Sequence, residues 1–333
     1  MVLVSVIVPI HNMQDYLFEC LQSLSKQTLQ NFEVILINDG SVDHSSDIIN
    51  NFVSSDVRFH VYETTHVGQS RARKIGLDHS KGKYLAFLDS DDVVASQWLA
   101  TLVDDLISSN ADMSAVGFDL LFVKRNGKRK FVQMNTKGSF SIIEGKDVLK
   151  AWMSCDAIGG FLWNKMFKKE LFCHIKFAHT DYMEDIFLIN QIIVKVHILS
   201  YRAASLYHYR QRANSSVNRS FKKSDLESLD YVYTMIRLAE DDEEMKPLAF
   251  SRYAKTTMSI INKMKKRDIV LNNQEIQKIL DNLYVHRKYL QLKNPIDNLI
   301  LLTMLKTRRI YILSRLEKGL INFKYYLKLI GGD

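Results

Sequence analysis

Three aspartates, Asp89, Asp91 and Asp92, stand within four residues directly after the apolar run KYLAFL. Clustered carboxylates repel one another and need a compensating partner. A solvated turn before a helix is one explanation, because Asp and Ser are common at such positions. A divalent-metal site is the other, because carboxylate oxygens bind such ions. The local sequence is compatible with both.

The first 110 residues alternate short strand-like runs with segments of helical periodicity. VSVIVPI, FEVILIND, RFHVYET and KYLAFLDSDD are each followed by an amphipathic stretch. Four such units predict an α/β fold with a mostly parallel sheet flanked by helices. In such sheets ligands bind outside the carboxyl ends of the strands. The clusters HN, NDGS and DSDD all fall at those ends, so we expect one site there.

The middle of the chain departs from this alternation. Two strand-like runs flank Asn126-Gly127, a dipeptide typical of a tight hairpin. Further strand-like and helical segments follow, and from about residue 222 the pattern is helical to the end. We therefore predict a domain boundary near residue 220.

Composition restricts the classes of function. The chain has 333 residues, of which 47% are hydrophobic and 25% charged, which is ordinary for a globular protein. Residues 251–333 hold 17 Lys and Arg against 6 Asp and Glu, an excess larger than the net charge of +8 for the whole chain. The first 250 residues are therefore mildly acidic. A nucleic-acid binder would spread its basic residues over the recognition surface, so we do not expect one.

The compartment is also indicated by the sequence. The apolar N-terminal run lacks a basic region before it and is broken by Pro9 and His11, far short of a membrane span. Cys20, Cys155 and Cys173 are odd in number and widely spaced, which favours reduced thiols. We expect a cytoplasmic protein.

A dinucleotide-binding dehydrogenase is not expected. The first strand-to-helix turn, PIHNMQD, has no glycine, and neither GxGxxG nor a Walker loop occurs in the chain. The phosphates of a bound nucleotide would need other partners, and a metal held by DSDD is the obvious candidate. Asp39 could accept hydrogen bonds from a ribose or a base, and Arg73 could pair with a nucleotide or with Asp39. When each is taken alone, a turn residue and a solvated helix face are the favoured explanations.

Taken together, SVIVPIHN, QNFEVILINDGSVDHS, GQSRARKIGL and KYLAFLDSDD resemble, in order and spacing, the successive signatures of the family 2 glycosyltransferases with the GT-A fold. The resemblance runs from about residue 3 to residue 220. It implies a bacterial, inverting enzyme with a catalytic domain over 1–220, made of a nucleotide-binding half (1–110) and an acceptor-binding half (111–220). Residues 221–333 would form a helical, basic C-terminal domain.

The resemblance also implies a role for individual residues. Pro9 and His11 would lie beside the uracil of a UDP-sugar, and Asp39 would bind the nucleoside. Asp89 would contact the ribose or a metal-bound water, and Asp91 would coordinate Mn²⁺ or Mg²⁺. The full set assigned to the nucleotide sugar is Pro9, His11, Asp39, Arg73, Asp89, Ser90, Asp91, His208, Arg210, Arg212 and Ser215. The metal ligands among them would be Asp91, Asp89 and His208.

The segment MEDIFL supplies the expected catalytic pair. Asp185 resembles the family's general base, which removes the acceptor proton as the hydroxyl attacks the sugar. Glu184 would orient Asp185 or bind acceptor hydroxyls. Two acids in a first helical turn, favourable to the helix dipole, are the alternative. Trp163, Asn164 and Lys165 would line the acceptor side, although a core tryptophan is equally compatible with the sequence.

We expect a hexosyl or N-acetylhexosaminyl transferase of cell-surface polysaccharide synthesis, acting on a glycan, a lipid-linked saccharide or a cell-wall polymer. A sugar-nucleotide nucleotidyltransferase and a non-catalytic sugar-binding or scaffold protein are the alternatives. The basic C-terminal third would either pack as a helical bundle or dock on an anionic membrane surface. Its candidate contacts are Lys306, Arg308, Arg309, Arg315, Lys318, Lys324 and Lys328. The oligomeric state is open.

Overall fold

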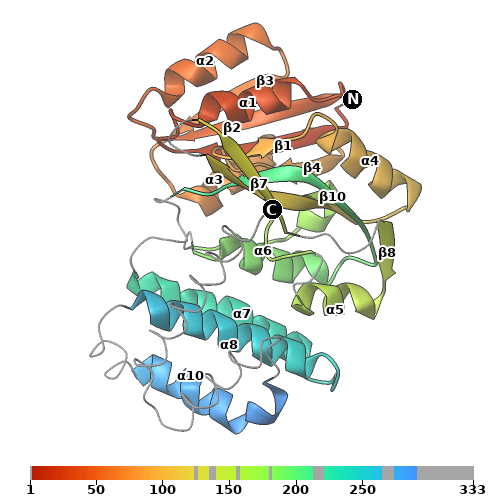
Figure 1. Cartoon of the computed structure of the whole chain (residues 1–333), viewed down its shortest axis with the longest axis vertical. Helices are drawn as coiled ribbons and strands as arrows, with labels where there is room; N and C mark the ends of the chain where they lie inside the picture. Colours follow the sequence, from red (N-terminus) through yellow and green to blue (C-terminus); the bar gives the residue numbers. More distant parts are fainter. Residues whose placement is uncertain are drawn as a thin grey trace. The chain divides into compact units, whose positions relative to one another are not determined.

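The structure is a computed structural model that describes residues 2–123, 127–134, 140–154, 158–179, 182–212, 221–264 and 274–290. The chain divides into two compact units, residues 1–217 and 218–333. The first unit is an α/β sandwich and the second is helical (Figure 1).

The described elements of the α/β unit follow one another in this order: β1 (Val4–Ile10), α1 (Leu17–Ser25), β2 (Phe32–Asp39), α2 (Ser45–Ser55), β3 (Phe59–Thr64), α3 (Gln69–His79), β4 (Tyr84–Phe87), β5 (Val93–Val94), α4 (Trp98–Ser108), β6 (Met113–Val123), β7 (Arg129–Gln133), β8 (Phe140–Glu144), α5 (Lys146–Ser154), β9 (Lys165–Lys168), the 3-10 helix η1 (Lys169–Phe172), α6 (Glu184–Ile193) and β10 (Ile198–Arg210).

The described strands form one sheet with the order β3-β2-β1-β4-β9-β6-β10-β5, and β7 and β8 pair with β6 and β10. The first four strands of that order are parallel to one another, which confirms the predicted strand-then-helix units. Pairing of β1 with β4 stops at Ile7, before Pro9, whose missing N–H cannot serve a ladder. The carboxyl ends of these strands therefore meet at one edge.

Two apolar layers cover the sheet, because successive side chains of a strand point to opposite faces. Val6 and the other β1 residues that point to the same face belong to the large core, to which α1, α2 and α4 also contribute. On the other face, Ile35 of β2 packs with Ala72 of α3. Ile7 also points to that face, and a Cβ on Gly76 of α3 would lie 2.4 Å from its Cγ2. Helix α3 thus lies close against the sheet because residue 76 has no side chain.

The second half of the unit extends the sheet with antiparallel pairs. β6 and β7 form the hairpin predicted around Gly127, which has a φ of 76°. β9 runs antiparallel between β4 and β6, and β10 runs parallel to β6. β10 also pairs with β5, the two-residue strand that follows the aspartate cluster. This pairing brings the C-terminal half of β10 beside that cluster.

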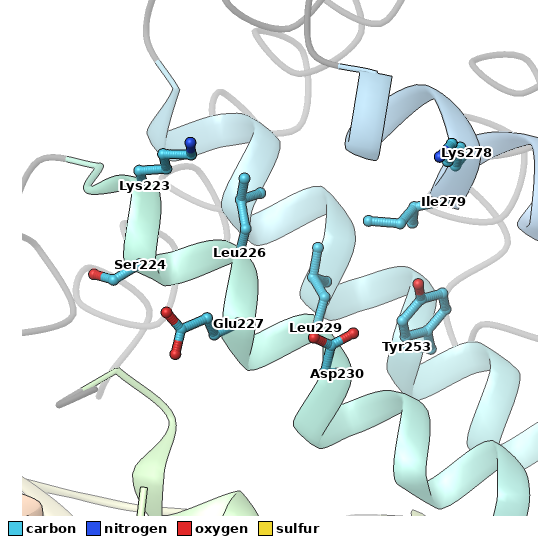
Figure 2. A pocket seen from close by; sticks show the side chains of 9 residues that line it. All are labelled: Lys223, Ser224, Leu226, Glu227, Leu229, Asp230, Tyr253, Lys278 and Ile279. Carbon is cyan, nitrogen blue, oxygen red and sulfur yellow. The ribbon is translucent and has the colours of Figure 1, made fainter. Parts of the chain in front are cut away.

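The described elements of the helical unit are η3 (Lys223–Leu226), α7 (Glu227–Leu238), α8 (Lys246–Lys263), α10 (Gln274–Val285) and η4 (Arg287–Tyr289). α7 and α8 lie side by side (Figure 1). A hollow opens between α7, α8 and α10 (Figure 2). Across the described part of the chain, every helix is too short or too polar to cross a membrane. The seven basic residues from Lys306 to Lys328 lie outside the described residues, so their contact with a membrane stays a prediction.

Candidate functional site

The expected site lies at the carboxyl edge of the parallel strands. Asp39 is the last residue of β2, His11 follows directly after β1, and Asp89 lies two residues after the end of β4. Pro9 is buried inside β1, and Ser90 is buried next to Asp89. The strand alternation seen in the sequence is the reason that these side chains gather.

The carboxylate of Asp39 is held by the loop that leads into α3. It accepts hydrogen bonds from Thr64 Oγ1 at 2.5 Å, from the Val67 N–H at 2.6 Å and from the Gly68 N–H at 2.9 Å. Burial acts to raise the pKa of Asp39, but these bonds outweigh it and hold the pKa below its ordinary value. Gly68 has a φ of 90°, a conformation that favours glycine. Asp39 is therefore a fixed, ionised acceptor at the strand end.

Two histidine rings lie beside Asp39. His11 Nδ1 is 2.7 Å from the Asp39 carbonyl oxygen, and the His11 and His66 rings stack with their centroids 4.0 Å apart. His66 is exposed and has a φ of 57°. The stacked pair presents a flat surface next to a fixed carboxylate, which suits a planar base.

Arg73 joins three carboxylates from two distant parts of the chain. It points inward from α3 and is 1% exposed. Nη2 donates to Asp89 Oδ1 at 2.9 Å, while Nη1 donates to Glu184 Oε1 at 2.6 Å and to Asp185 Oδ1 at 2.8 Å. The end of β4 and the start of α6 are thereby held together by one guanidinium. Arg73 does not pair with Asp39, which was one of the two partners considered from the sequence.

Glu184 and Asp185 share one buried site. Burial and the neighbouring charge of Asp185 together raise the pKa of Glu184 to about 8, against the opposing effect of Arg73. Burial also raises the pKa of Asp185, against the effect of Arg73, with Asp89 adding to the increase. Asp185 Oδ2 accepts a 3.3 Å hydrogen bond from the Leu162 N–H. The Asp185 side chain is 15% exposed, so it is the more accessible acid of the two.

The remaining aspartates of the cluster differ in role. Asp91 forms an ion pair with Arg212 through its Oδ2. Asp92 is fully buried and accepts hydrogen bonds from the Tyr207 hydroxyl at 2.6 Å and from the Arg210 N–H at 2.8 Å. Asp92 does not cap a helix, because the next helix, α4, begins at Trp98 and has Gln97 as its N-cap. Asp92 ties β10 to the aspartate cluster.

Arg210 is positioned by groups that sequence analysis did not single out. Its Nε donates to the Asp91 carbonyl oxygen at 2.7 Å, and its Nη2 donates to Glu19 Oε2 at 2.8 Å. Glu19 lies on α1 and also pairs with Arg129 of β7 at 2.7 Å. In the sequence, nothing distinguishes Glu19 and Arg129 from ordinary surface charges. Only the folded sheet brings them close to Arg210.

His208 lies apart from the aspartate cluster. The rings of Tyr207 and Tyr209 both stack on Trp163, so the side chain between them points the other way. His208 Nδ1 is 3.4 Å from Asp119 Oδ2, and its ring packs edge-on against Phe131. Burial lowers its pKa, with Asp119 opposing the shift. The structure therefore does not bring His208 together with Asp89 and Asp91 as the third member of a metal site.

The three residues expected on the acceptor side are buried. Trp163 is 2% exposed and stacks on Phe161 and Tyr207 at centroid distances of 4.7 and 4.3 Å. Asn164 donates to the Val116 carbonyl oxygen at 2.8 Å. Lys165 Nζ donates to the Phe161 carbonyl oxygen at 2.5 Å and to Asn164 Oδ1 at 2.7 Å. Their partners are protein groups, so they can shape the wall behind the site but present no free face to a ligand.

Asp89 and Asp91 have the chemistry that a divalent ion requires. Burial raises the pKa of Asp91 despite its ion pair with Arg212, and Asp89 raises it further. A cation bound at Asp91 would offset the burial and favour the charged form of this carboxylate. Within the described ranges, no three His, Cys, Asp or Glu side chains are grouped so as to hold an ion. The protein ligands that would fit such an ion are therefore the two carboxylates of Asp89 and Asp91. Ser215, also expected to bind the nucleotide, lies outside the described residues.

The chain shares its fold with a solved glycosyltransferase structure. S. aureus TarS residues 1–349, in complex with UDP-GlcNAc, superpose with a TM-score of 0.63 and 17% identity, covering 96% of this chain and 92% of that one. The mostly parallel sheet with its helical C-terminal region is thus the GT-A fold.

Sequence comparisons give the family. Glycosyl transferase family 2 matches residues 5–194. The glycosyltransferase GlyA of Streptococcus pneumoniae serotype 4 is 31% identical over 216 residues, which cover 64% of this chain but 31% of GlyA. GlyG of the same strain is 29% identical over 67% of this chain and 75% of its own length. The uncharacterized glycosyltransferase EpsJ of Bacillus subtilis is 29% identical over 69% of this chain and 67% of EpsJ. The chain belongs to glycosyl transferase family 2, which confirms the resemblance seen in its motifs.

Proposed function

We propose that this chain is an inverting transferase that moves a hexosyl or N-acetylhexosaminyl group from a UDP-sugar to a hydroxyl of a glycan, a lipid-linked saccharide or a cell-wall polymer in cell-surface polysaccharide synthesis. The observation that carries the proposal is the bridge made by Arg73, because it holds an acid of the donor edge, Asp89, beside the candidate base, Asp185. TarS, with the same fold, was solved with UDP-GlcNAc bound, which supports a UDP-sugar as the donor class.

Asp185 is the candidate general base. An acceptor hydroxyl becomes a stronger nucleophile when a carboxylate takes its proton as the new bond forms. Because burial raises the pKa of Asp185, the group is a better proton acceptor than an exposed aspartate. Glu184 also has a raised pKa and shares Nη1 of Arg73 with Asp185, so we assign it the positioning of that guanidinium.

The donor would lie along the strand ends. Asp39 offers a fixed carboxylate to the nucleoside, and the His11 ring offers a stacking surface for uracil. Arg212 lies at Asp91, where positive charge would stabilise the charge that develops on the departing diphosphate. Arg210 is more buried and would act by fixing the backbone of Asp91. His208 lies against Asp119, so we give it no direct contact with the donor. Trp163, Asn164 and Lys165 are held by protein groups, so we give them no direct contact with the acceptor.

Asp89 and Asp91 would hold a Mn²⁺ or Mg²⁺ ion, with the diphosphate and water as further ligands, as is usual for these ions. The bound ion would neutralise negative charge on the leaving group. The cytoplasmic location and the division into nucleotide-binding (1–110), acceptor-binding (111–220) and C-terminal (221–333) parts remain predictions from the sequence.

The test is release of UDP from a panel of UDP-sugars, with Mn²⁺ or with EDTA, by the wild type and by Asp185→Asn. We expect the substitution to lower the rate about 10²- to 10⁴-fold, the usual contribution of a general base.

Asp78→Asn is the matched control, because Asp78 is an exposed acid of α3 that pairs only with Lys74 among the described residues. A wild-type rate for Asp185→Asn would refute the base, and activity in EDTA would refute the metal. Pyrophosphate as the product would indicate a nucleotidyltransferase instead.

A further inference from the structure

The helical unit contains a hollow that the family match, residues 5–194, does not include. Its volume is about 570 Å³, within the range of roughly 300–1,000 Å³ typical of small-molecule sites. Leu226 and Leu229 line one side and Ile279 of α10 lines the other (Figure 2). Polar groups surround this apolar floor: Lys223, Ser224, Glu227, Asp230, Tyr253 and Lys278.

Tyr253 is a buried residue that lines the hollow. The residue is 4% exposed, and Figure 2 shows its hydroxyl on the side of the ring that faces α10. Among the described residues, no donor or acceptor forms a hydrogen bond with this hydroxyl. Burial raises its pKa, with Tyr233 and Asp230 adding to the shift, so the group stays protonated. The hydroxyl is therefore available to a ligand in the hollow, because a tyrosine presents an apolar ring and a polar tip.

The charged side chains at the rim of the hollow also lack protein partners among the described residues. In the described part of the chain, the side chains of Glu227, Asp230, Lys223 and Lys278 take part in no hydrogen bond or ion pair. Two carboxylates and two ammonium groups sum to zero charge, so the hollow does not select a strongly charged ligand. It offers several separate donors and acceptors above an apolar floor.

We propose that this hollow binds neutral sugar residues of a glycan. Sugar hydroxyls both donate and accept, so they can pair with the carboxylates of Glu227 and Asp230 and with the ammonium groups of Lys223 and Lys278. The Tyr253 hydroxyl adds a further polar partner, and the C–H face of a sugar ring can pack on Leu229 and Ile279. A phosphate-bearing ligand would gain little, because its repulsion from the two carboxylates offsets its attraction to the two ammonium groups.

The identity of the ligand rests on the proposed function, because a glycosyltransferase meets glycans as acceptor and product. Binding at this site needs no turnover and no donor, so it can be measured even if the assignment of the donor is wrong.

The test is saturation-transfer NMR on the full chain with cellobiose, maltose and N,N′-diacetylchitobiose. Glucose 1-phosphate and glucosamine serve as anionic and cationic comparators. We expect at least one neutral disaccharide to bind, and Tyr253→Phe to weaken its binding about 2- to 12-fold, the range for loss of one uncharged hydrogen bond. Asp230→Asn, which removes a charge-assisted acceptor, should weaken binding by about tenfold or more.

Tyr233→Phe is the matched control. Tyr233 packs against Tyr253 with ring centroids 5.5 Å apart but does not line the hollow, so its loss of a hydroxyl should leave sugar binding unchanged. Because no described residue forms a hydrogen bond with the Tyr253 hydroxyl, Tyr253→Phe should also leave the melting temperature unchanged. A clear fall in melting temperature would instead assign the hydroxyl a structural role and overturn the proposal.

Two further results would overturn it: equal binding by wild type and Tyr253→Phe, or tighter binding of glucose 1-phosphate than of every neutral disaccharide. With a disaccharide acceptor that supports turnover, Tyr253→Phe should raise the KM for the acceptor and leave kcat and the KM for the donor unchanged. Failure of UDP release with intact sugar binding would reject the proposed function but not this site.

Discussion

Replacement of Arg73 by methionine should be the most damaging single change in the α/β unit. The substitution keeps the apolar stem but leaves Asp89, Glu184 and Asp185 without the guanidinium that contacts all three at 2.6 to 2.9 Å. Removal of one partner from a buried ion pair typically costs about 3–5 kcal/mol. That is a large part of the roughly 5–15 kcal/mol that stabilises a typical protein.

The assay is thermal unfolding of Arg73→Met at pH 5 and pH 8. At about 2–4 °C per kcal/mol for a domain of this size, the melting temperature should fall by about 6–20 °C. The freed carboxylates of Glu184 and Asp185 should take up protons more readily than in the wild type, because the guanidinium that lowers their pKa is gone. The loss should therefore be smaller at pH 5 than at pH 8.

Arg71→Met is the matched control on the same helix. Arg71 is exposed, and among the described residues it forms no ion pair or hydrogen bond, so its replacement should change stability by less than about 0.5 kcal/mol. Arg73→Lys keeps the charge without the planar fork and should fall between the two. Equal melting temperatures for the two methionine variants, or a loss that is the same at both pH values, would refute the assigned role of Arg73.

Two other changes test the packing and charge of this region. Glu184→Gln should flatten the pH dependence of unfolding by urea: burial raises the folded pKa of Glu184 from 4.5 to about 8, so the stability it contributes is full below pH 4.5 and is lost as the pH rises through 8. A variant as pH-dependent as the wild type would contradict this. Gly76→Ala places a methyl group 2.4 Å from Ile7 Cγ2 and should cost about 1–3 kcal/mol in urea unfolding; an unchanged midpoint would show that α3 moves freely away from β1.

The sequence predicted the parallel half of the sheet well, because local periodicity determines where strands and helices form. The ends of β2 and β4 could be located from the pattern, and with them Asp39 and Asp89. The hairpin at Gly127 and the helix that begins at Glu184 were equally visible. These features depend on residues within a few positions of one another.

Features that depend on distant partners were not predictable in the same way. The partners of Arg73 lie up to 112 residues away, so no local pattern distinguishes them from Asp39. The direction of His208 depends on which face of β10 packs against Trp163. Burial of Trp163 itself depends on Phe161 and Tyr207 closing around it. A motif gave the type of each residue, but tertiary packing decided what each side chain reaches.

The wide separation of paired residues has a consequence for synthesis of the chain. Glu19 is among the first residues made, yet its partner Arg210 is 191 positions later. Two of the three carboxylate partners of Arg73, Glu184 and Asp185, come 111 and 112 positions after it. Such distant closures are slow steps in folding because the intervening chain must first be ordered. The parallel strands emerge from the ribosome early, whereas the site waits until β10 has been released. A protein that is halted or truncated before β10 would therefore present an assembled sheet edge in which Asp91 and Asp92 lack their partners Arg212, Tyr207 and Arg210.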